Sequence, residues 1–180
     1  MPDADVVSLV FTAYGSVVEQ DRSEHPRVRS RLYHLEQVMK YVCDAPGAKT
    51  WFRIETEAEA ILESRAMNHA VEKHFRRAHD EATKTYVPPR SEAFIEQNIG
   101  LQAHIQRVMP VFLTLRDGEG TALATAMLPP PGRNIGAFKP IIVGLANSDP
   151  YQEHASAIRT LGEHFGLTLD PDRCYPYRRK

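Results

Sequence analysis

The sequence predicts an α+β fold in which a mainly helical N-terminal half packs on a small antiparallel sheet. The sheet would contain a β-hairpin and one or two further strands, and a C-terminal helix would follow it. Three observations predict this class. Apolar residues recur mainly at helical spacing up to about residue 108, two strand patterns then flank a glycine-containing turn, and a capped helical pattern follows.

Length and composition predict a soluble protein with one domain over residues 1–180. The chain has 180 residues, 42% hydrophobic and 25% charged, which is ordinary for a globular domain. Its two cysteines, Cys43 and Cys174, fit no metal or redox spacing. An acidic N-terminus and the lack of an apolar run of about 20 residues predict a cytoplasmic protein with reduced thiols and no membrane contact. The excess of arginine over lysine and the abundance of alanine indicate a bacterial source.

Two helices are predicted in the first quarter of the chain. The first spans about Ala4 to Glu19, with Asp3 or Asp5 as its cap. The second spans about Arg27 to Cys43, and its apolar residues follow each other at steps of four and three, which is an a/d seam. If this seam is exposed, it predicts a homodimer. The residues of that interface would be Val28, Leu32, Leu35 and Met39.

A strand over Thr50 to Glu55 is predicted to run into one long helix over residues 56–84. Thr56 and Glu59 have the spacing of a capping box at its start. The apolar stripe of this helix drifts by about a quarter turn along its length. Either the helix wraps over two neighbours or it breaks near Asn68. The stripe consists first of Ile54, Ala58, Ile61 and Leu62, and then of Val71, Phe75, Ala78 and Ala82.

A fourth helix is predicted from Ser91 to about Val108, and strands follow it. Segments 111–116 and 121–128 predict a hairpin around the turn Asp117–Gly120. A third strand is predicted over residues 141–145, and a last helix over residues 149–166, with Asp149 as its cap and Gly166 at its end. The second strand of the hairpin places three alanines on one face, where a helix can approach closely or a pocket can form. They are Ala122, Ala124 and Ala126.

The helix predicted over 56–84 carries the densest group of titratable side chains. His69, His74 and His79 lie five residues apart, which turns them by about 140° around a helix, so they do not suit one metal ion. The charges largely complement the helix dipole. We therefore predict no metal and no cofactor, and we assign no catalytic residue. The candidate ligand-binding residues are Arg65, His69, His74, Arg76 and Arg77, of which Arg65 and His69 are expected nearest the inward face.

No catalytic motif is present, and whether the protein is an enzyme stays open at this stage. The first hypothesis is a non-enzymatic module that binds a partner protein or a small molecule. The alternative is an enzyme that acts on an anionic small molecule through the histidines and arginines of residues 56–84. A weaker alternative is nucleic-acid binding through the basic and aromatic tail, residues 173–180. The formal net charge of −1 argues against a dedicated nucleic-acid binder.

Overall fold

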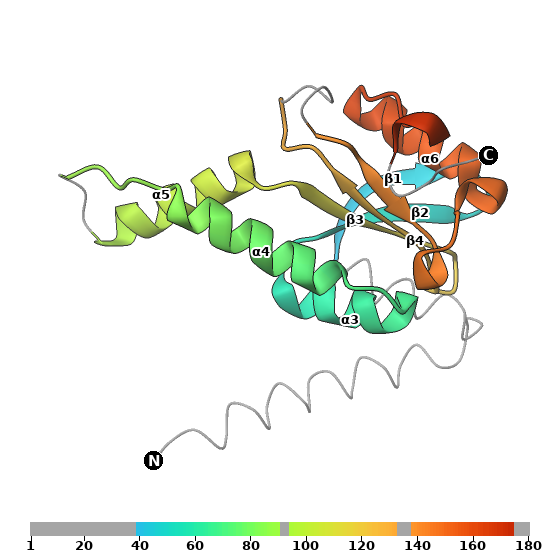
Figure 1. The fold of residues 1–180 in the computed structure, drawn as a ribbon, viewed down its shortest axis with the longest axis horizontal. Helices are drawn as coiled ribbons and strands as arrows, with labels where there is room; N and C mark the ends of the chain where they lie inside the picture. Colours follow the sequence, from blue (N-terminus) through green and yellow to red (C-terminus); the bar gives the residue numbers. More distant parts are fainter. Residues whose placement is uncertain (1–38, 91–93, 133–137, 175–180) are drawn as a thin grey trace, which may run out of the picture.

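In the computed structural model, which describes residues 39–90, 94–132 and 138–174, five strands form one antiparallel sheet (Figure 1). The strand order is β1-β2-β3-β4-β5, so each strand pairs with its neighbour in the sequence. The strands are β1 (Lys40–Ala45), β2 (Lys49–Ile54), β3 (Val111–Arg116), β4 (Ala122–Leu128) and β5 (Ile141–Val143). The helices are α3 (Glu57–Met67), α4 (Val71–Lys84), α5 (Phe94–Val108) and α6 (Tyr151–Phe165), with 3₁₀ turns η3 (Leu145–Asn147) and η4 (Pro171–Arg173).

The prediction of a mainly helical N-terminal half carrying a small sheet is wrong. The sheet begins at Lys40, and two of its five strands precede α3. The predicted helix over 27–43 is wrong at its C-terminal end, because residues 40–45 form β1 and pair with β2. Gly47 and Ala48, with φ of 80° and 52°, make the turn between these strands. Helices instead connect β2 to β3, and the fold is α+β.

The predictions for the segment before residue 39 lie outside the described residues. This concerns the helix over 4–19 and three residues of the proposed dimer seam, Val28, Leu32 and Leu35. The fourth, Met39, is described, and its side chain is buried in the core of its own chain, 7% exposed. The dimer stays a prediction for the other three residues.

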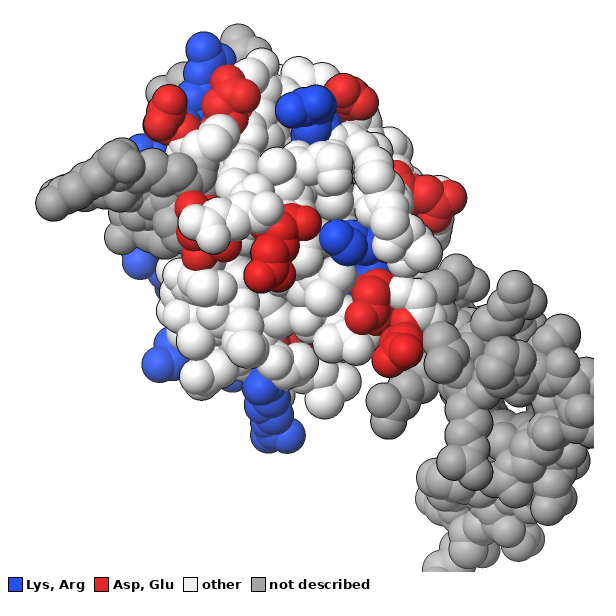
Figure 2. All heavy atoms as spheres, turned by 90° about the vertical axis from the view of Figure 1, so that its right-hand side faces the viewer, with Lys and Arg blue, Asp and Glu red and all other residues white. Residues whose placement is uncertain are grey.

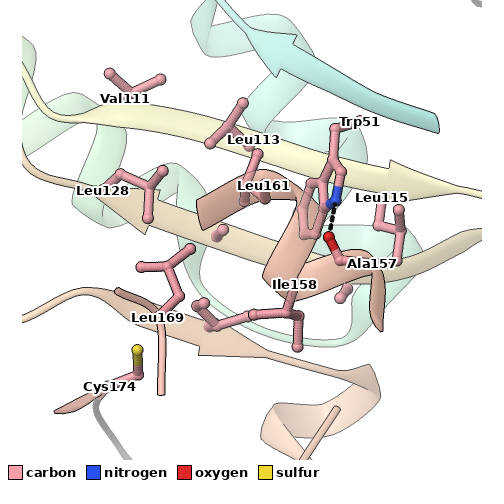
Figure 3. Packing of buried hydrophobic residues seen from close by; sticks show 13 residues of the cluster. Trp51, Val111, Leu113, Leu115, Leu128, Ala157, Ile158, Leu161, Leu169 and Cys174 are labelled. Atoms are coloured by element: carbon pink, nitrogen blue, oxygen red, sulfur yellow. Dashed lines mark hydrogen bonds between the residues drawn. The ribbon is translucent and has the colours of Figure 1, made fainter. Parts of the chain in front are cut away.

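The sheet is packed on both faces, because the side chains of its strands alternate. One face contacts α6, and its cluster includes Trp51, Leu113 and Leu115 of the strands (Figure 3). The other face packs against α3 and α4, and α5 packs on α4; the apolar cluster on this side includes Phe52 and Phe112. The alanine face of β4 belongs to the α6 side: Ala124 and Ala126 are buried in one cluster with Ala157, Ile158 and Leu161. These small side chains are thus part of the core between the sheet and α6.

The predicted hairpin is confirmed. Strands β3 and β4 pair antiparallel in continuous register apart from an irregularity next to Arg116. The carboxylate of Asp117 accepts hydrogen bonds from the backbone N–H groups of Glu119 and Thr121, at 3.0 and 2.8 Å, and so closes the turn. The last helix is also present and ends at Gly166 in the left-handed conformation, with φ of 64°.

The predicted long helix consists of two helices, so the second alternative, a break near Asn68, is the correct one. The capping box at the start of α3 is confirmed, with Thr56 and Glu59 each accepting from the other's backbone N–H. The helix ends at Asn68, which has φ of 50° and ψ of 51°. Asparagine tolerates this left-handed conformation better than most residues. The short link that follows, His69 and Ala70, turns the chain into α4.

The surface is mixed in character. The first half of α5 exposes large apolar side chains, Phe94, Ile95 and Ile99. Figure 2 shows one face of the molecule, on which basic and acidic side chains are interspersed among uncharged residues. The mixture of charges on this face agrees with the near-neutral net charge of the chain. Among the helices of the described residues, none combines the length and the apolar character needed to cross a membrane.

Candidate functional site

A pocket lies where the start of α4 crosses strands β4 and β5. Its volume is about 180 Å³. The sheet supplies an apolar floor that includes Phe112, Met127 and Ile141, and the link before α4 supplies His69 and Ala70. The full lining consists of His69, Ala70, Val71, His74, Phe112, Thr125, Ala126, Met127, Ile141, Val143 and Asn147. The pocket is therefore mainly apolar, and its polar side chains are His69, His74, Thr125 and Asn147.

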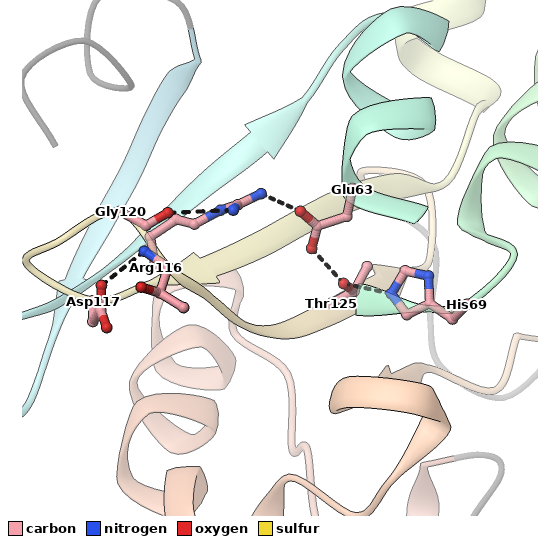
Figure 4. A network of polar contacts seen from close by, with 7 residues as sticks. Glu63, His69, Arg116, Asp117, Gly120 and Thr125 are labelled. Carbon is pink, nitrogen blue, oxygen red and sulfur yellow. Dashed lines mark hydrogen bonds and ion pairs between the residues drawn. The ribbon is translucent and has the colours of Figure 1, made fainter. Parts of the chain in front are cut away.

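A chain of buried polar contacts runs under α3 to this pocket (Figure 4). Arg116 of β3 forms an ion pair with one carboxylate oxygen of Glu63. The other oxygen of Glu63 accepts a hydrogen bond from the Thr125 hydroxyl, at 2.5 Å. Thr125 Oγ1 in turn lies 2.8 Å from Nε2 of His69. We call these four residues the polar relay; Glu63 at its centre is only 1% exposed.

The local structure explains why the relay forms. Glu63 lies on the inward face of α3, one turn from Ala60 and from Met67, and all three are buried. Thr125 lies on the face of β4 opposite to the alanines, so it points toward α3 and away from α6. His69 is held by its backbone N–H, which donates to the Ser64 carbonyl at 3.2 Å. The Ser64 hydroxyl also bonds the side chain and the backbone N–H of Glu72, so the link between the two helices is fixed at both ends.

The hydrogen-bond donors and acceptors of the polar relay determine which ring nitrogen of His69 carries the proton. A threonine hydroxyl has one proton, and a carboxylate paired with arginine is an acceptor. Thr125 therefore donates to Glu63, and its oxygen accepts from Nε2–H of His69. The other ring nitrogen, Nδ1, then carries a lone pair. It is buried and has no hydrogen-bond partner among the described residues.

The surroundings keep His69 uncharged near neutral pH. Burial lowers the pKa of His69 below its ordinary value of 6.5, and the nearby carboxylates of Glu63 and Glu72 oppose this shift only in part.

Two further buried atoms of the described residues have no hydrogen-bond partner, Thr114 Oγ1 and Arg116 Nε. Both belong to β3, the strand that carries the arginine of the relay.

The structure brings two of the five predicted ligand-binding residues together and separates the others from them. His69 and His74 line the same pocket. Arg76 and Arg77 line a different hollow on the surface of α4 and form ion pairs with Glu57 and Glu81. Arg65 is exposed, and so it does not lie on the inward face of α3, where it was expected.

His69 and His74 are not separated by the turn of about 140° predicted from their spacing. That turn applies only within one continuous helix. Since the helix breaks at Asn68, His69 lies in the link and His74 lies in the first turns of α4, and both reach the pocket. No group of three or more His, Cys, Asp or Glu side chains that could hold a metal ion occurs within the ranges described above.

Sequence reasoning missed Glu63, Thr125 and Arg116. A weak signal was present for two of them. Glu63 falls in the spacing of Ala60 and Met67, and Thr125 alternates with small residues that mark the opposite face of its strand. The sequence contained no indication that the two would meet, because they lie 62 residues apart.

The burial of neutral His69 predicts a contribution to the pH dependence of stability. In the unfolded chain, this histidine takes up a proton as the pH falls through about 6.5, whereas the folded protein takes it up at lower pH. The unfolded state thus binds more protons in this range, and the free energy of unfolding falls as the pH falls below about 6.5. We expect His69→Gln to reduce this slope in urea titrations at a series of pH values.

The slope is expected to fall but not to vanish, because burial and Lys49 also lower the pKa of His154. His79→Gln, at an exposed position of α4, is the matched control and should leave the slope unchanged. An identical slope in the His69→Gln protein would contradict the assignment of a neutral, half-buried His69.

The chain was compared with family models, with curated protein sequences and with solved structures, and none of the three comparisons gives a match.

Proposed function

We propose that this protein is a binding module for a small molecule, which occupies the pocket between the start of α4 and strands β4 and β5. The observation that supports this proposal best is a mainly apolar pocket of about 180 Å³ with a few polar side chains in its lining. Small-molecule sites commonly have this composition, in which apolar walls supply affinity and few polar groups supply orientation.

The size of the pocket limits the ligand. An apolar cavity of about 150 Å³ suffices to bind benzene. The pocket described here is of that order, so it suits a molecule with one ring or a short branched chain. A nucleotide or a peptide would extend well beyond it.

The other two hypotheses receive less support. An enzyme that acts on an anion through the histidines and arginines of residues 56–84 requires these side chains in one site, but Arg76 and Arg77 lie in ion pairs away from the pocket. Nucleic-acid binding through the tail concerns residues that lie almost entirely outside the described ones. Both stay predictions, as does binding of a partner protein.

Filling the pocket tests the proposal. Ala70 lines it and is only partly buried, so Ala70→Leu should occupy space in the pocket without disturbing the core. We expect ligand-observed NMR with a library of small uncharged fragments to find binders of the wild-type protein. Ala70→Leu should weaken these binders by about tenfold or more, which corresponds to about 1.4 kcal/mol.

The matched control is Ala66→Leu, which adds the same side chain at an exposed position of α3 away from the pocket. It should leave fragment binding unchanged. The proposal fails if no fragment binds the wild-type protein, or if the two variants affect binding equally.

A further inference from the structure

We propose that the exposed apolar face at the start of α5 is covered by a segment of the same chain, residues 27–38, through the seam residues Val28, Leu32 and Leu35. No residue of α5 lines the pocket, so this contact is independent of the proposed function. Three observations support it: the exposure of this face, the position of Met39, and the similar lengths of the seam and of α5.

The first half of α5 presents large apolar side chains to solvent. Phe94, Ile95 and Ile99 are 78%, 72% and 65% exposed. Ile95 and Ile99 lie one helical turn apart, and Phe94 adjoins Ile95, so the three side chains form one patch. Helix α5 packs mainly on α4, and its start lies away from the sheet (Figure 1). Single exposed apolar residues are common, but a group of large ones marks a contact surface.

The segment that precedes the described residues enters the structure near the other end of α5. Met39 is the last residue of the predicted seam, and its side chain is 7% exposed. It belongs to the same apolar cluster as Ile105, in the second half of α5, and Met109, just beyond the helix. Residues 27–38 therefore start from the buried end of α5, and the exposed patch lies at its opposite end.

The predicted seam has the length and the spacing to run along α5. From Val28 to Met39 a helix rises by about 16 Å, and from Ile105 back to Ile95 α5 rises by about 15 Å. Val28, Leu32 and Leu35 follow each other at steps of four and three, so a helix over residues 27–38 presents them on one side. With Met39 held in the core, such a helix lies beside α5 with Leu35 toward Ile105 and Val28 toward Ile95.

The size of the patch favours the chain's own segment over a second copy. Full burial of three large apolar side chains removes on the order of 300 Å² of apolar surface from water. A stable dimer usually buries about 800 Å² on each partner. A segment that is already joined to the fold at Met39 does not pay the cost of association, so a smaller contact suffices.

Hydrogen–deuterium exchange of the full chain, measured by mass spectrometry, tests the proposal. Amide exchange reports how often a helix opens locally, and a packed helix opens less often than an uncovered one. Leu32→Glu places a charge in the proposed contact. We expect it to accelerate exchange in residues 96–102 by about tenfold, because burial of the unpaired carboxylate is unfavourable and the segment is released from α5.

The matched control is Ser30→Glu, which adds the same charge on the opposite side of the predicted helix and should leave the exchange of α5 unchanged. The contact is mutual, so Ile99→Glu should in turn accelerate exchange in residues 29–38. Strand β3 should keep its protection in all three variants, which shows that the fold is intact. Leu32→Ala adds no charge and should give a smaller acceleration confined to α5, so it carries the test if Leu32→Glu also exposes β3.

Two outcomes would overturn the proposal. One is equal exchange of α5 in the wild-type protein, Leu32→Glu and Leu32→Ala. The other comes from light scattering at a series of concentrations, in which we expect a monomer with a protected α5. If the protein is a dimer and α5 loses its protection on dilution to the monomer, a second copy covers the patch instead of the chain's own segment.

Discussion

Replacing Arg116 with methionine is expected to lower the free energy of unfolding by about 3–5 kcal/mol, because it leaves the carboxylate of Glu63 buried without its charged partner. The side chains of Arg116 and Glu63 are 11% and 1% exposed. Water therefore cannot replace the lost guanidinium without opening the contact between α3 and β4. Urea denaturation followed by far-UV circular dichroism measures the change.

The exposed pair between Arg76 and Glu57 is the matched control, with a distance of 2.7 Å from the arginine Nε to the carboxylate. Its side chains are 57% and 48% exposed, so Arg76→Met should change stability by no more than about 1 kcal/mol.

A double variant tests whether the unpaired charge of Glu63 causes the loss of stability in Arg116→Met. Adding Glu63→Gln to Arg116→Met removes the unpaired charge and should recover part of the loss. If Arg116→Met costs as little as the control, the ion pair is not buried in solution.

The same ion pair connects the stability of the fold to the candidate site. One carboxylate oxygen of Glu63 forms the ion pair with Arg116, and the other accepts a hydrogen bond from Thr125. Thr125 in turn orients His69. Loss of the arginine leaves this carboxylate free to shift or to become protonated. We therefore expect a change at Arg116 to alter the pocket as well as the stability, although the arginine does not line the pocket.

Elements with strong local signals could be predicted from the sequence. The capping box at Thr56, the turn at Asp117 and the left-handed glycine at the end of α6 each depend on a few neighbouring residues. The start of the sheet could not be predicted in this way. Val42 continues the helical spacing of Val28, Leu32, Leu35 and Met39. Pairing with β2, which in turn pairs with β3, nevertheless makes residues 40–45 a strand.

The candidate site could be predicted only in part, for a related reason. His69 and His74 were identified as candidates because titratable residues cluster along this stretch of the sequence. Their common pocket depends on the break at Asn68, which the drifting apolar stripe indicated as one of two alternatives. The partner that gives His69 its tautomer comes from β4, and the charge that holds Glu63 comes from β3, so only the tertiary fold unites them.

Trp51→Ala is expected to lower the free energy of unfolding by about 3–5 kcal/mol, which is the usual cost of truncating a large buried aromatic side chain. Trp51 is completely buried between β2 and α6, where its indole N–H donates to the carbonyl of Ala157 at 2.9 Å (Figure 3). The substitution removes this bond and leaves a cavity at the centre of the α6 side of the sheet. Far-UV circular dichroism is the suitable measurement, because Trp51 is the only tryptophan of the chain.

Phe94→Ala is the control, since this aromatic side chain is 78% exposed and its loss should cost well under 1 kcal/mol. A loss below 1 kcal/mol for Trp51→Ala would contradict the packing of α6 on the sheet.

Trp51→Ala and Arg116→Met are also expected to differ in their effect on the candidate site. Trp51 lies on the α6 face and the polar relay lies on the α3 face, so Trp51→Ala should weaken the fold but leave fragment binding at the pocket unchanged. Arg116→Met, which acts on the polar relay itself, should reduce both the free energy of unfolding and fragment binding.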